Sequence, residues 1–357
     1  MAVAERLRKL RQRLLEKDLD GVIITQPDSC RYISGFTGSG GTILVSQSAA
    51  VLVTDFIYSE QAKHEAPSFH ITVAANPAQR FSLLLSDQAA NRLGFEPNIL
   101  SFSDYQRLAE EAGKVQSAVV PAEGLVESIR CVKEAEELAL IQKAAGLADS
   151  AVRYIMAEIR PGMTEKQAAW EIEKYLRERN SEAVPFEIIV ASGPNAALPH
   201  ARPTERPIST SEPIIIDLGA RVDGYCSDIS RTLCLGRQDD TFRRIYDIVL
   251  QAQLTAVGNI EAGMTGAQAD SLARAVIQNA GYGEEFGHGL GHGLGLAVHE
   301  EPRIGPNSTA VIAEDMVFTV EPGIYVSGWG GVRIEDTVLM EKGKARTLTT
   351  ATRSASL

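Results

Sequence analysis

The chain has 357 residues, 44% of them hydrophobic, which is enough for two ordinary globular domains. Its formal net charge of −11 would repel a nucleic-acid backbone, and no apolar run approaches the roughly 20 residues of a membrane span, so we expect neither partner. In the N-terminal segment, Glu5, Glu16 and Asp18 disfavour a transit peptide, and the segment lacks the apolar run of a signal peptide. The four cysteines lack CxxC spacing. A cytoplasmic protein with free thiols is expected.

Residues 1–126 are predicted to form an α/β domain that opens with an amphipathic helix. Three short runs then predict strands: GVIIT (21–25), TILVS (42–46) and AVLVT (50–54). The glycine-rich segment GFTGSGG (35–41) matches neither the dinucleotide fingerprint nor the phosphate loop. We therefore expect a turn there and no nucleotide site.

A second domain is predicted over residues 127–357, with a long helix at 133–159. This domain contains an internal repeat, because residues 158–176 resemble residues 259–277, 101 positions later. Each copy carries GMT followed by Gln and Ala at matching offsets. The repeat predicts two similar halves that face each other across one central site.

Each copy of the repeat begins a predicted helix with a capping box. Thr164 is followed by Gln167, and Thr265 by Gln268, at the spacing that this motif requires. After each helix come a strand-like run, a histidine and two carboxylates. These residues are His200, Asp217 and Asp228 after the first copy, and His299, Glu321 and Glu335 after the second.

The first pair of acids lies in a predicted β-hairpin. Asp223-Gly224 is a strong two-residue turn signal. A turn centred there sets Gly219 opposite Asp228, with Asp217 on the same face about 7–8 Å away at Cα. Gly219 is expected to leave space for a metal that both carboxylates share.

The second pair of acids lies in a similar predicted hairpin. A turn centred at Gly328 sets Glu321 directly opposite Glu335. Arg333, two residues before Glu335, then lies on the same face. Both hairpins therefore present two carboxylates on one side.

Together with His292, these acids form a candidate metal-ligand set. Four carboxylates and one imidazole are too many anions for one Zn²⁺ and suit two divalent cations, with Mn²⁺ preferred and Co²⁺ or Zn²⁺ possible. The alternative is a set of buried acids neutralised by arginines, which are too few here. The set is Asp217, Asp228, His292, Glu321 and Glu335.

The segment around His292 is not predicted to be helical. His288 and His292 are four residues apart, but glycines alternate between residues 287 and 295, which disfavours a helix. Such glycines are expected where the backbone lies close to a metal or substrate. The HExxH pattern of zinc peptidases is absent, because His299 is followed by EEPR.

Five segments that carry these residues resemble the Xaa-Pro peptidases, prolidase and aminopeptidase P, which share the pita-bread fold with methionine aminopeptidase. The segments are PHARP (199–203), DLGARVDGYCSDISRT (217–232), FGHGLGHGLGLAVHEEP (286–302), EPGIY (321–325) and GVRIED (331–336). YISGFTGSGG (32–41) and LVTDFIYSEQA (52–62) resemble the N-terminal domain of this family. The resemblance implies an α/β domain of the creatinase/prolidase N-terminal type, followed by an α+β pita-bread catalytic domain with a pseudo-two-fold repeat.

The resemblance also implies a role for each ligand. Asp217 would bind one metal, and Asp228 with Glu335 would bridge the two. His292 and Glu321 would complete the ligands of the second metal, and Glu321 would also carry a proton during catalysis. The metals would activate water against the carbonyl of an Xaa-Pro bond.

Further positions would contact the substrate or support the ligands. His200 and His299 would bind the substrate and stabilise the tetrahedral intermediate or the leaving nitrogen. His288 would line the pocket, and Arg333 would support the metal ligands from behind. Ser230 stands where the family usually has threonine, and it keeps the hydroxyl.

The function implied is hydrolysis of Xaa-Pro bonds in proline-containing di- or oligopeptides. A dipeptidase (prolidase) is favoured, with Arg303 as a partner for the free carboxylate of proline, and an aminopeptidase acting on longer peptides is the alternative. Creatinase-like chemistry and a non-catalytic binding module are less favoured, because the ligand set is intact. A methionine-aminopeptidase-like enzyme is less favoured, because such enzymes share the ligands but usually lack this N-terminal domain. The family also implies a homodimer.

Overall fold

The computed structural model describes residues 2–86 and 90–355. It divides into two compact units, Met1–Arg130 and Cys131–Leu357. The predicted domain boundary, between residues 126 and 127, falls a few residues before this division and stays a prediction. Within the described residues, no helix is both long and apolar enough to cross a membrane. The four cysteines are buried free thiols.

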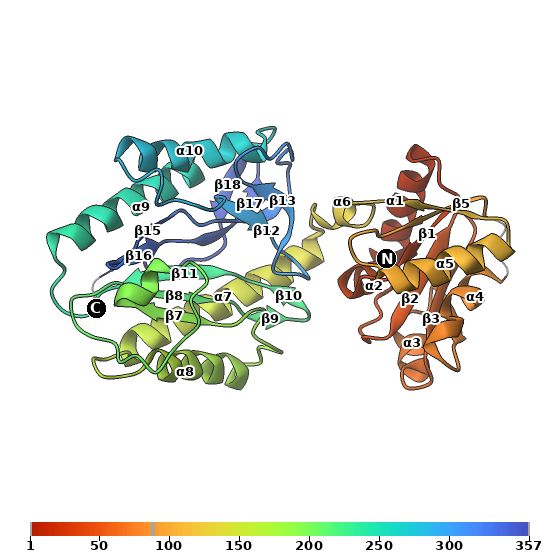
Figure 1. Ribbon diagram of the computed structural model, residues 1–357, viewed down its shortest axis with the longest axis horizontal. Helices are drawn as coiled ribbons and strands as arrows, with labels where there is room; N and C mark the ends of the chain where they lie inside the picture. The colour runs from red at the N-terminus through yellow and green to blue at the C-terminus, as the bar shows by residue number, and fades with distance from the viewer. Residues whose placement is uncertain (1, 87–89, 356–357) are drawn as a thin grey trace. The chain divides into compact units, whose positions relative to one another are not determined.

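The N-terminal unit is an α/β unit on one mixed sheet, in the order β4-β3-β2-β1-β5-β6 (Figure 1). β1, β2 and β3 pair antiparallel, whereas β4, β5 and β6 join in parallel. The three predicted strands are confirmed. The strands are β1 (Gly21–Ile24), β2 (Gly41–Ser46), β3 (Ala50–Thr54), β4 (His70–Val73), β5 (Arg92–Phe95) and β6 (Ala118–Pro121). The helices are α1 (Ala2–Glu16), α2 (Pro27–Ser34), α3 (Ser59–Glu65), η1 (Pro77–Gln79), α4 (Arg80–Leu85), α5 (Phe102–Lys114) and α6 (Glu127–Arg130).

The glycines of the segment after α2 allow its backbone to turn and to pack closely. Gly35 ends α2 in the left-handed conformation, with φ of 85°. A Cβ atom on Gly38 would collide with the ring of Phe36. These glycines therefore permit a tight turn, as predicted.

The C-terminal unit repeats one order of elements: two helices, a strand and a hairpin (Figure 1). The first half contains α7 (Ala135–Glu158), α8 (Glu165–Glu178), β7 (Ile189–Ser192), η2 (Gly193–Ala197), β8 (Ile214–Leu218), β9 (Arg221–Val222), β10 (Tyr225–Cys226) and β11 (Ile229–Leu233). The second contains α9 (Asp240–Asn259), α10 (Gly266–Asn279), β12 (Gly291–Gly293), β13 (Glu300–Ile304), β14 (Val317–Val320), β15 (Gly323–Val326), β16 (Gly330–Arg333), β17 (Asp336–Glu341) and β18 (Lys344–Thr347).

Each half has its own hydrophobic core between helices and strands. In the first half, α7 and α8 pack on the strands through residues such as Ile155, Ile172 and Ile216. In the second half, α9 and α10 do the same, for example through Ile277 and Phe318. The helix pairs cover opposite sides of the strands, which leaves the hairpins of the two halves in the middle (Figure 1).

Both predicted capping boxes are present, which supports the internal repeat. The Thr164 hydroxyl accepts from the Gln167 N–H at 3.2 Å, and the Gln167 side chain accepts from the Thr164 N–H at 2.9 Å. Thr265 and Gln268 make the equivalent bonds at 3.2 and 2.8 Å. Each pair satisfies two backbone N–H groups at the start of its helix.

The predicted register of the first hairpin is confirmed. Val222 pairs with Tyr225 across the turn, and β8 and β11 continue in the same register. Gly219 is therefore opposite Asp228. Asp223 and Gly224 both have positive φ, of 46° and 80°, as a two-residue hairpin turn requires.

The predicted register of the second hairpin is also confirmed. β14 and β17 pair Val320 with Asp336, and β15 and β16 keep that register as far as the turn. Glu321 is therefore opposite Glu335. Gly328 lies in the turn with φ of 79°.

Candidate functional site

The five candidate metal ligands lie at equivalent places in the two halves. Asp217 is in β8, and Asp228 directly precedes β11. Glu321 directly follows β14, Glu335 directly precedes β17, and His292 is in the middle of β12. In each hairpin, the strand pairing is interrupted next to the two acids. The two acid pairs meet in space, as the repeat predicted.

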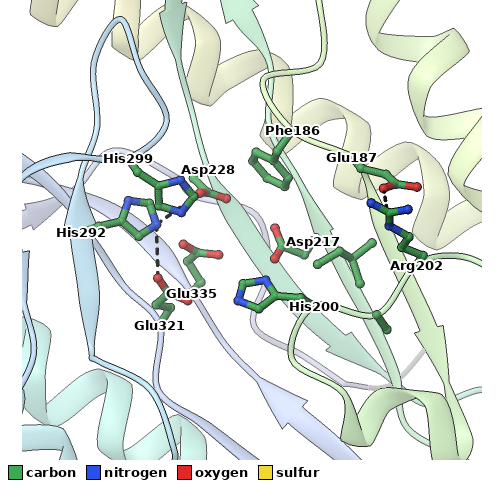
Figure 2. Close-up of a pocket in the computed structure, with 12 residues that line it drawn as sticks. Phe186, Glu187, His200, Arg202, Asp217, Asp228, His292, His299, Glu321 and Glu335 are labelled. Carbon is green, nitrogen blue, oxygen red and sulfur yellow. Dashed lines mark ion pairs between the residues drawn. The ribbon is translucent and has the colours of Figure 1, made fainter. Parts of the chain in front are cut away.

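All five side chains line one cavity of about 350 Å³ (Figure 2). His200 lies on the side of the acids away from His299, and Arg202 lies farther from His292, beside Glu187. The lining residues are Phe186, Glu187, Ile189, His200, Ala201, Arg202, Asp217, Asp228, His292, His299, Glu321 and Glu335.

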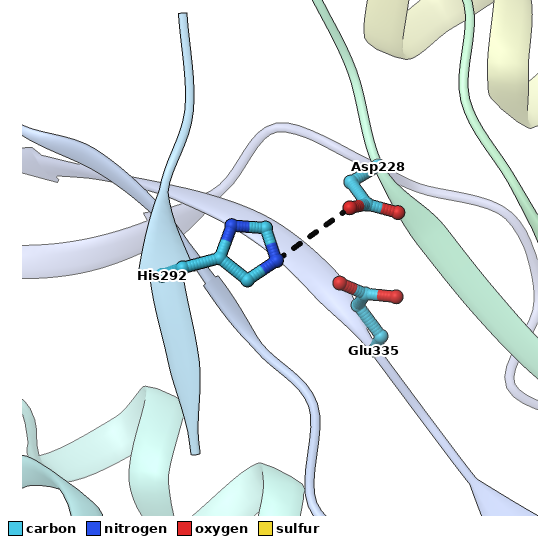
Figure 3. A group of neighbouring side chains, drawn as sticks. All are labelled: Asp228, His292 and Glu335. Atoms are coloured by element: carbon cyan, nitrogen blue, oxygen red, sulfur yellow. Dashed lines mark ion pairs between the residues drawn. The ribbon is translucent and has the colours of Figure 1, made fainter. Parts of the chain in front are cut away.

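The tightest cluster in this cavity joins the two halves. Ligand atoms of Asp228, His292 and Glu335 all lie within 4.8 Å of one another (Figure 3). His292 Nε2 is 3.7 Å from Asp228 Oδ2 and 3.3 Å from Glu321 Oε1. Asp217 lies outside this cluster, on the same side as His200 (Figure 2). The ligand roles of all five stay predictions.

Burial makes the negative charge of these acids costly. It raises the pKa of Asp228 and Glu335 well above the usual range, and repulsion from neighbouring carboxylates adds to the effect. Burial also raises the pKa of Glu321. Without a cation, the cluster would hold protons that ordinary surface acids release.

Three buried carboxylate oxygens of the set accept no hydrogen bond from any described residue. They are Asp217 Oδ1, Asp228 Oδ1 and Glu335 Oε1. Buried polar atoms in folded proteins nearly always have a partner, so these exceptions need an explanation. Carboxylate oxygens beside an imidazole nitrogen are suitable donors for Mn²⁺, Co²⁺ or Zn²⁺. The donor set therefore fits divalent cations.

His292 is held in the form that a metal ligand requires. Its Nδ1 donates to the backbone carbonyl of Gly293 at 3.1 Å, which leaves the Nε2 lone pair facing the acids. Burial lowers the pKa of His292, so the imidazole is neutral near pH 7.

Arg333 connects the acids of the two halves from behind the cavity. Its Nη2 donates to Asp217 Oδ2 at 2.6 Å, and its Nε donates to Ser230 Oγ at 2.9 Å. Ser230 in turn donates to Glu335 Oε2 at 2.7 Å. The hydroxyl that Ser230 retains thus contacts a candidate ligand, and Nη1 of Arg333 also donates to the hydroxyl of Tyr325 at 2.9 Å.

His200 and His299 both line the cavity, and each residue is partly exposed and partly covered by its neighbours. The His299 ring is 4.2 Å from the His292 ring, between centroids. Burial, with His292 and His200 nearby, lowers the pKa of His299 to about 4. The backbone beside His299 is held by Glu300, which accepts from the Ala297 N–H at 2.9 Å.

Two predicted substrate residues do not line the cavity. His288 Nδ1 donates to the Gly289 carbonyl at 2.7 Å, and its Nε2 is 3.0 Å from the Tyr325 hydroxyl. Its role as a pocket residue stays a prediction. Arg303 is an exposed residue of β13 and is also outside the lining set. Its substrate role stays a prediction.

The sequence reasoning missed several residues that surround the cavity. Arg202 lines it, with Nε 3.1 Å from Glu187 Oε2, and Phe186 lies next to Glu187. Tyr325 connects His288 to Arg333, and burial raises its pKa to about 12. Arg202 is inside the segment PHARP, so its proximity to His200 was the available signal.

The predicted reason for several glycines is wrong. A Cβ atom on Gly219 would collide with the Ser227 carbonyl, and one on Gly291 with the Thr319 carbonyl. Gly293 is pressed in the same way against the backbone of β13. These glycines allow neighbouring chain segments to approach closely; they do not make room for a metal or a substrate.

Two family models match this chain. Residues 139–342 match metallopeptidase family M24, and residues 6–132 match the creatinase/prolidase N-terminal domain. Together the matches cover most of both structural units. They confirm the predicted fold, an α/β N-terminal domain followed by a duplicated pita-bread catalytic domain.

Individual relatives span the whole chain. The chain is 37% identical over 346 residues to an Xaa-Pro dipeptidase of Pyrococcus furiosus, covering 97% of each chain. Its structure is similar to that of an Xaa-Pro dipeptidase from Bacillus anthracis, with a TM-score of 0.95, 39% identity, and coverage of 99% of this chain and 100% of that one. It is also similar to the structure of an X-Pro aminopeptidase from Thermotoga maritima, with a TM-score of 0.90 and 36% identity. The match covers 98% of this chain and 99% of that one.

Proposed function

The chain belongs to metallopeptidase family M24 and is a metal-dependent peptidase, and on that premise we propose that it is an Xaa-Pro dipeptidase. One observation carries the proposal: carboxylates of both halves converge with His292 in a cavity that also exposes His200 and His299. Three of the carboxylate oxygens are buried without a partner. This combination supports a metal centre next to a substrate site.

The proposed cofactors are two divalent cations, with Mn²⁺ first and Co²⁺ or Zn²⁺ as alternatives. Asp217 with Asp228 and Glu335 would hold one cation. Asp228 and Glu335 would also contribute to holding the other, together with His292 and Glu321. When bound, the cations supply Lewis acidity and lower the pKa of water at the centre.

Glu321 is the proposed proton carrier. Burial raises its pKa, so it can hold a proton that a surface glutamate would release, and pass it to the proline nitrogen as that bond breaks. It also lies 3.3 Å from His292 Nε2, at the edge of the acid cluster. The Thr319 hydroxyl donates to Glu321 Oε1 at 3.1 Å and orients the carboxylate.

The two exposed histidines bind the substrate in this proposal. His299 has a pKa of about 4, so it is neutral near pH 7 and acts through one N–H donor rather than as a cation. His200 approaches from the opposite side of the acids (Figure 2). Donors on both sides would stabilise negative charge that develops on the carbonyl oxygen and orient the leaving nitrogen.

A proline residue explains why such a dedicated site is needed. An Xaa-Pro bond has no N–H, and the ring fixes φ, so peptidases that hold an extended backbone through that N–H lose a contact. The cavity of about 350 Å³ is at the lower end of the range for small-molecule sites.

Two arginines are candidates for binding the free carboxylate of proline. Arg303 was the prediction from the sequence. Arg202 is the arginine that lines the cavity within the described residues, and its present partner is the exposed Glu187. We propose Arg202 as the first candidate and keep Arg303 as the second.

The second candidate function is an Xaa-Pro aminopeptidase, favoured by the similarity to the Thermotoga maritima structure. Turnover of Ala-Pro against Ala-Pro-Ala by metal-reconstituted protein separates the two. A clear preference for the dipeptide supports the proposal, and a preference for the tripeptide overturns it in favour of the aminopeptidase. No metal-dependent cleavage of either peptide overturns both.

Other predictions concern the surroundings of the enzyme. The homodimer and the cytoplasmic location stay predictions. Creatinase-like chemistry and a non-catalytic role are disfavoured here, because the complete ligand set is retained around one cavity. Methionine aminopeptidase activity is disfavoured because the chain carries the creatinase/prolidase N-terminal domain.

A further inference from the structure

A buried glutamate outside the cavity organises the loop that carries His200. Glu165 is the first residue of α8 and is fully buried. It accepts from the N–H and hydroxyl of Ser192 at 2.7 and 2.8 Å, and from the N–H and hydroxyl of Thr204 at 3.0 and 2.6 Å. The Asn195 amide donates to both carboxylate oxygens, at 3.1 and 3.0 Å.

These donors bracket the loop between β7 and β8. Ser192 and Asn195 precede His200, and Thr204 follows it. The middle of the loop is anchored as well: Arg333 Nη1 donates to the Pro199 carbonyl at 3.1 Å, and Ala196 and Ala201 are buried. Loops are ordinarily mobile, and a buried carboxylate that binds both ends of one restricts that motion.

The His200 ring has little else to hold it. Across residues 2–86 and 90–355, it forms no hydrogen bond, and the side chain is exposed to the cavity. Its position therefore depends on the backbone of the loop. A displacement of that backbone by about 1 Å is enough to cost a large factor in turnover when a group must face a reacting atom.

The second half of the unit does not repeat this arrangement. The residue equivalent to Glu165 is Gly266, which follows the capping Thr265 as Glu165 follows Thr164. A Cβ atom on Gly266 would collide with the Arg303 carbonyl. The carboxylate is thus a feature of the first half alone and is not required by the shared helix cap.

We propose that Glu165 is a positioning residue for catalysis: its carboxylate clasps both ends of the loop over residues 193–203 and so fixes His200 in the cavity. The proposal rests on the proposed function through the role of His200. A purely structural Glu165 would stabilise the fold without any energetic link to His200.

The test is a double-mutant cycle of Glu165→Gln with His200→Ala. The glutamine amide has nearly the same shape, but its NH₂ group cannot accept from the backbone N–H groups of Ser192 or Thr204. We expect Glu165→Gln to lower kcat/KM for Ala-Pro about tenfold to a hundredfold in the wild-type background, and to cause no further loss when His200 is already alanine. Hydrogen exchange of the amides over residues 193–204 should become faster, while metal content stays at the wild-type level.

Glu178→Gln, an exposed change on the same helix, is the matched control and should leave kcat/KM and exchange unchanged. Thr204→Val removes only the hydroxyl donor to Glu165, so it should lower kcat/KM by a smaller factor with the same dependence on His200. If Glu165→Gln does not fold, Thr204→Val takes its place in the double-mutant cycle. Equal losses in both backgrounds, or wild-type turnover despite faster exchange, would overturn the positioning role. Absence of Ala-Pro cleavage by the wild-type protein would instead count against the proposed function, and unchanged exchange would then still overturn the clasp.

Discussion

The two halves of the C-terminal unit share their elements but contribute differently to the cavity. The second half supplies three of the five candidate ligands, His292, Glu321 and Glu335, and the first half supplies Asp217 and Asp228. Most of the remaining lining comes from the first half: Phe186, Glu187, Ile189, His200, Ala201 and Arg202. A duplicated scaffold thus carries a shared metal centre and a one-sided substrate surface.

Equivalent acids in the two halves also differ in their surroundings. Asp217 is bound by the Arg333 guanidinium at 2.6 Å, whereas Glu321, at the equivalent position, lies beside His292 and has a raised pKa. The first acid thus has a fixed cation as its partner, whereas burial raises the pKa of the second and lets it hold a proton. This contrast explains why Glu321, rather than Asp217, is the proposed proton carrier.

The largest effect is expected where the halves meet. Glu335→Gln removes one carboxylate of the cluster formed with Asp228 and His292. We expect loss of bound metal and a fall in kcat/KM for Ala-Pro of about a thousandfold or more, because metal chemistry lowers such barriers by several kcal/mol. Metal analysis of the dialysed protein and turnover check this. Retained metal with near-normal turnover, as expected for the exposed control Glu284→Gln, would contradict a centre shared by both halves.

A smaller effect is expected for Arg333→Lys, which keeps the charge that joins the halves. A lysine ammonium cannot reproduce the contacts to Asp217, Ser230 and Tyr325 together. Turnover should fall about tenfold to a hundredfold, with weaker metal binding in a titration of the metal-free protein. Wild-type turnover together with wild-type metal affinity would show that Arg333 does not couple the two halves.

The one-sided substrate surface predicts a change of selectivity for Arg202→Ala. Exposed ion pairs such as Arg202 with Glu187 add little stability, so the pair is free to exchange partners with a substrate. The ratio of kcat/KM for Ala-Pro to that for Ala-Pro amide should fall about tenfold, because the amide lacks the carboxylate. Arg160→Ala, an exposed arginine outside the cavity, should keep the wild-type ratio. An unchanged ratio for Arg202→Ala would show that Arg202 does not bind the proline carboxylate and would favour Arg303 as its partner.

The smallest effect concerns stability and pH in the metal-free protein. Asp228, Glu321 and Glu335 have raised pKa values there, so the folded chain binds protons more tightly than the unfolded chain. The free energy of unfolding therefore falls as pH rises from about 4 towards those raised values. The melting temperature should drop by about 2–4 °C per kcal/mol lost, and added Mn²⁺ should raise it more at about pH 8 than at about pH 6. A larger Mn²⁺ effect at the lower pH would contradict the assignment.

Much of this arrangement could be predicted from local sequence signals. The turns at Asp223-Gly224 and Gly328 fix the hairpin registers, and those registers bring each acid pair to one side. The capping boxes reveal the repeat, and the repeat predicts that the two pairs meet. Each of these inferences depends on residues close together in the chain.

What could not be predicted depends on contacts between distant segments. Arg202 and Glu187 face each other because the loops before and after β7 fold back on one another. The spacing of hydrophobic residues in the sequence does not indicate how these loops fold. The glycines were misread for the same reason, since the Gly291 collision is with Thr319 on a neighbouring strand. The contact between His288 and the Tyr325 hydroxyl, which joins residues 37 positions apart, had no signal in the sequence.

The central claim is that acids of both halves bind the same divalent cations. Anomalous diffraction from crystals loaded with Mn²⁺ tests it most directly. The account predicts metal peaks with carboxylate oxygens of both Asp228 and Glu335 at about 2 Å, and with His292 bound to one of them. Peaks bound by only one half of the unit, or no peak in the cavity, would contradict it.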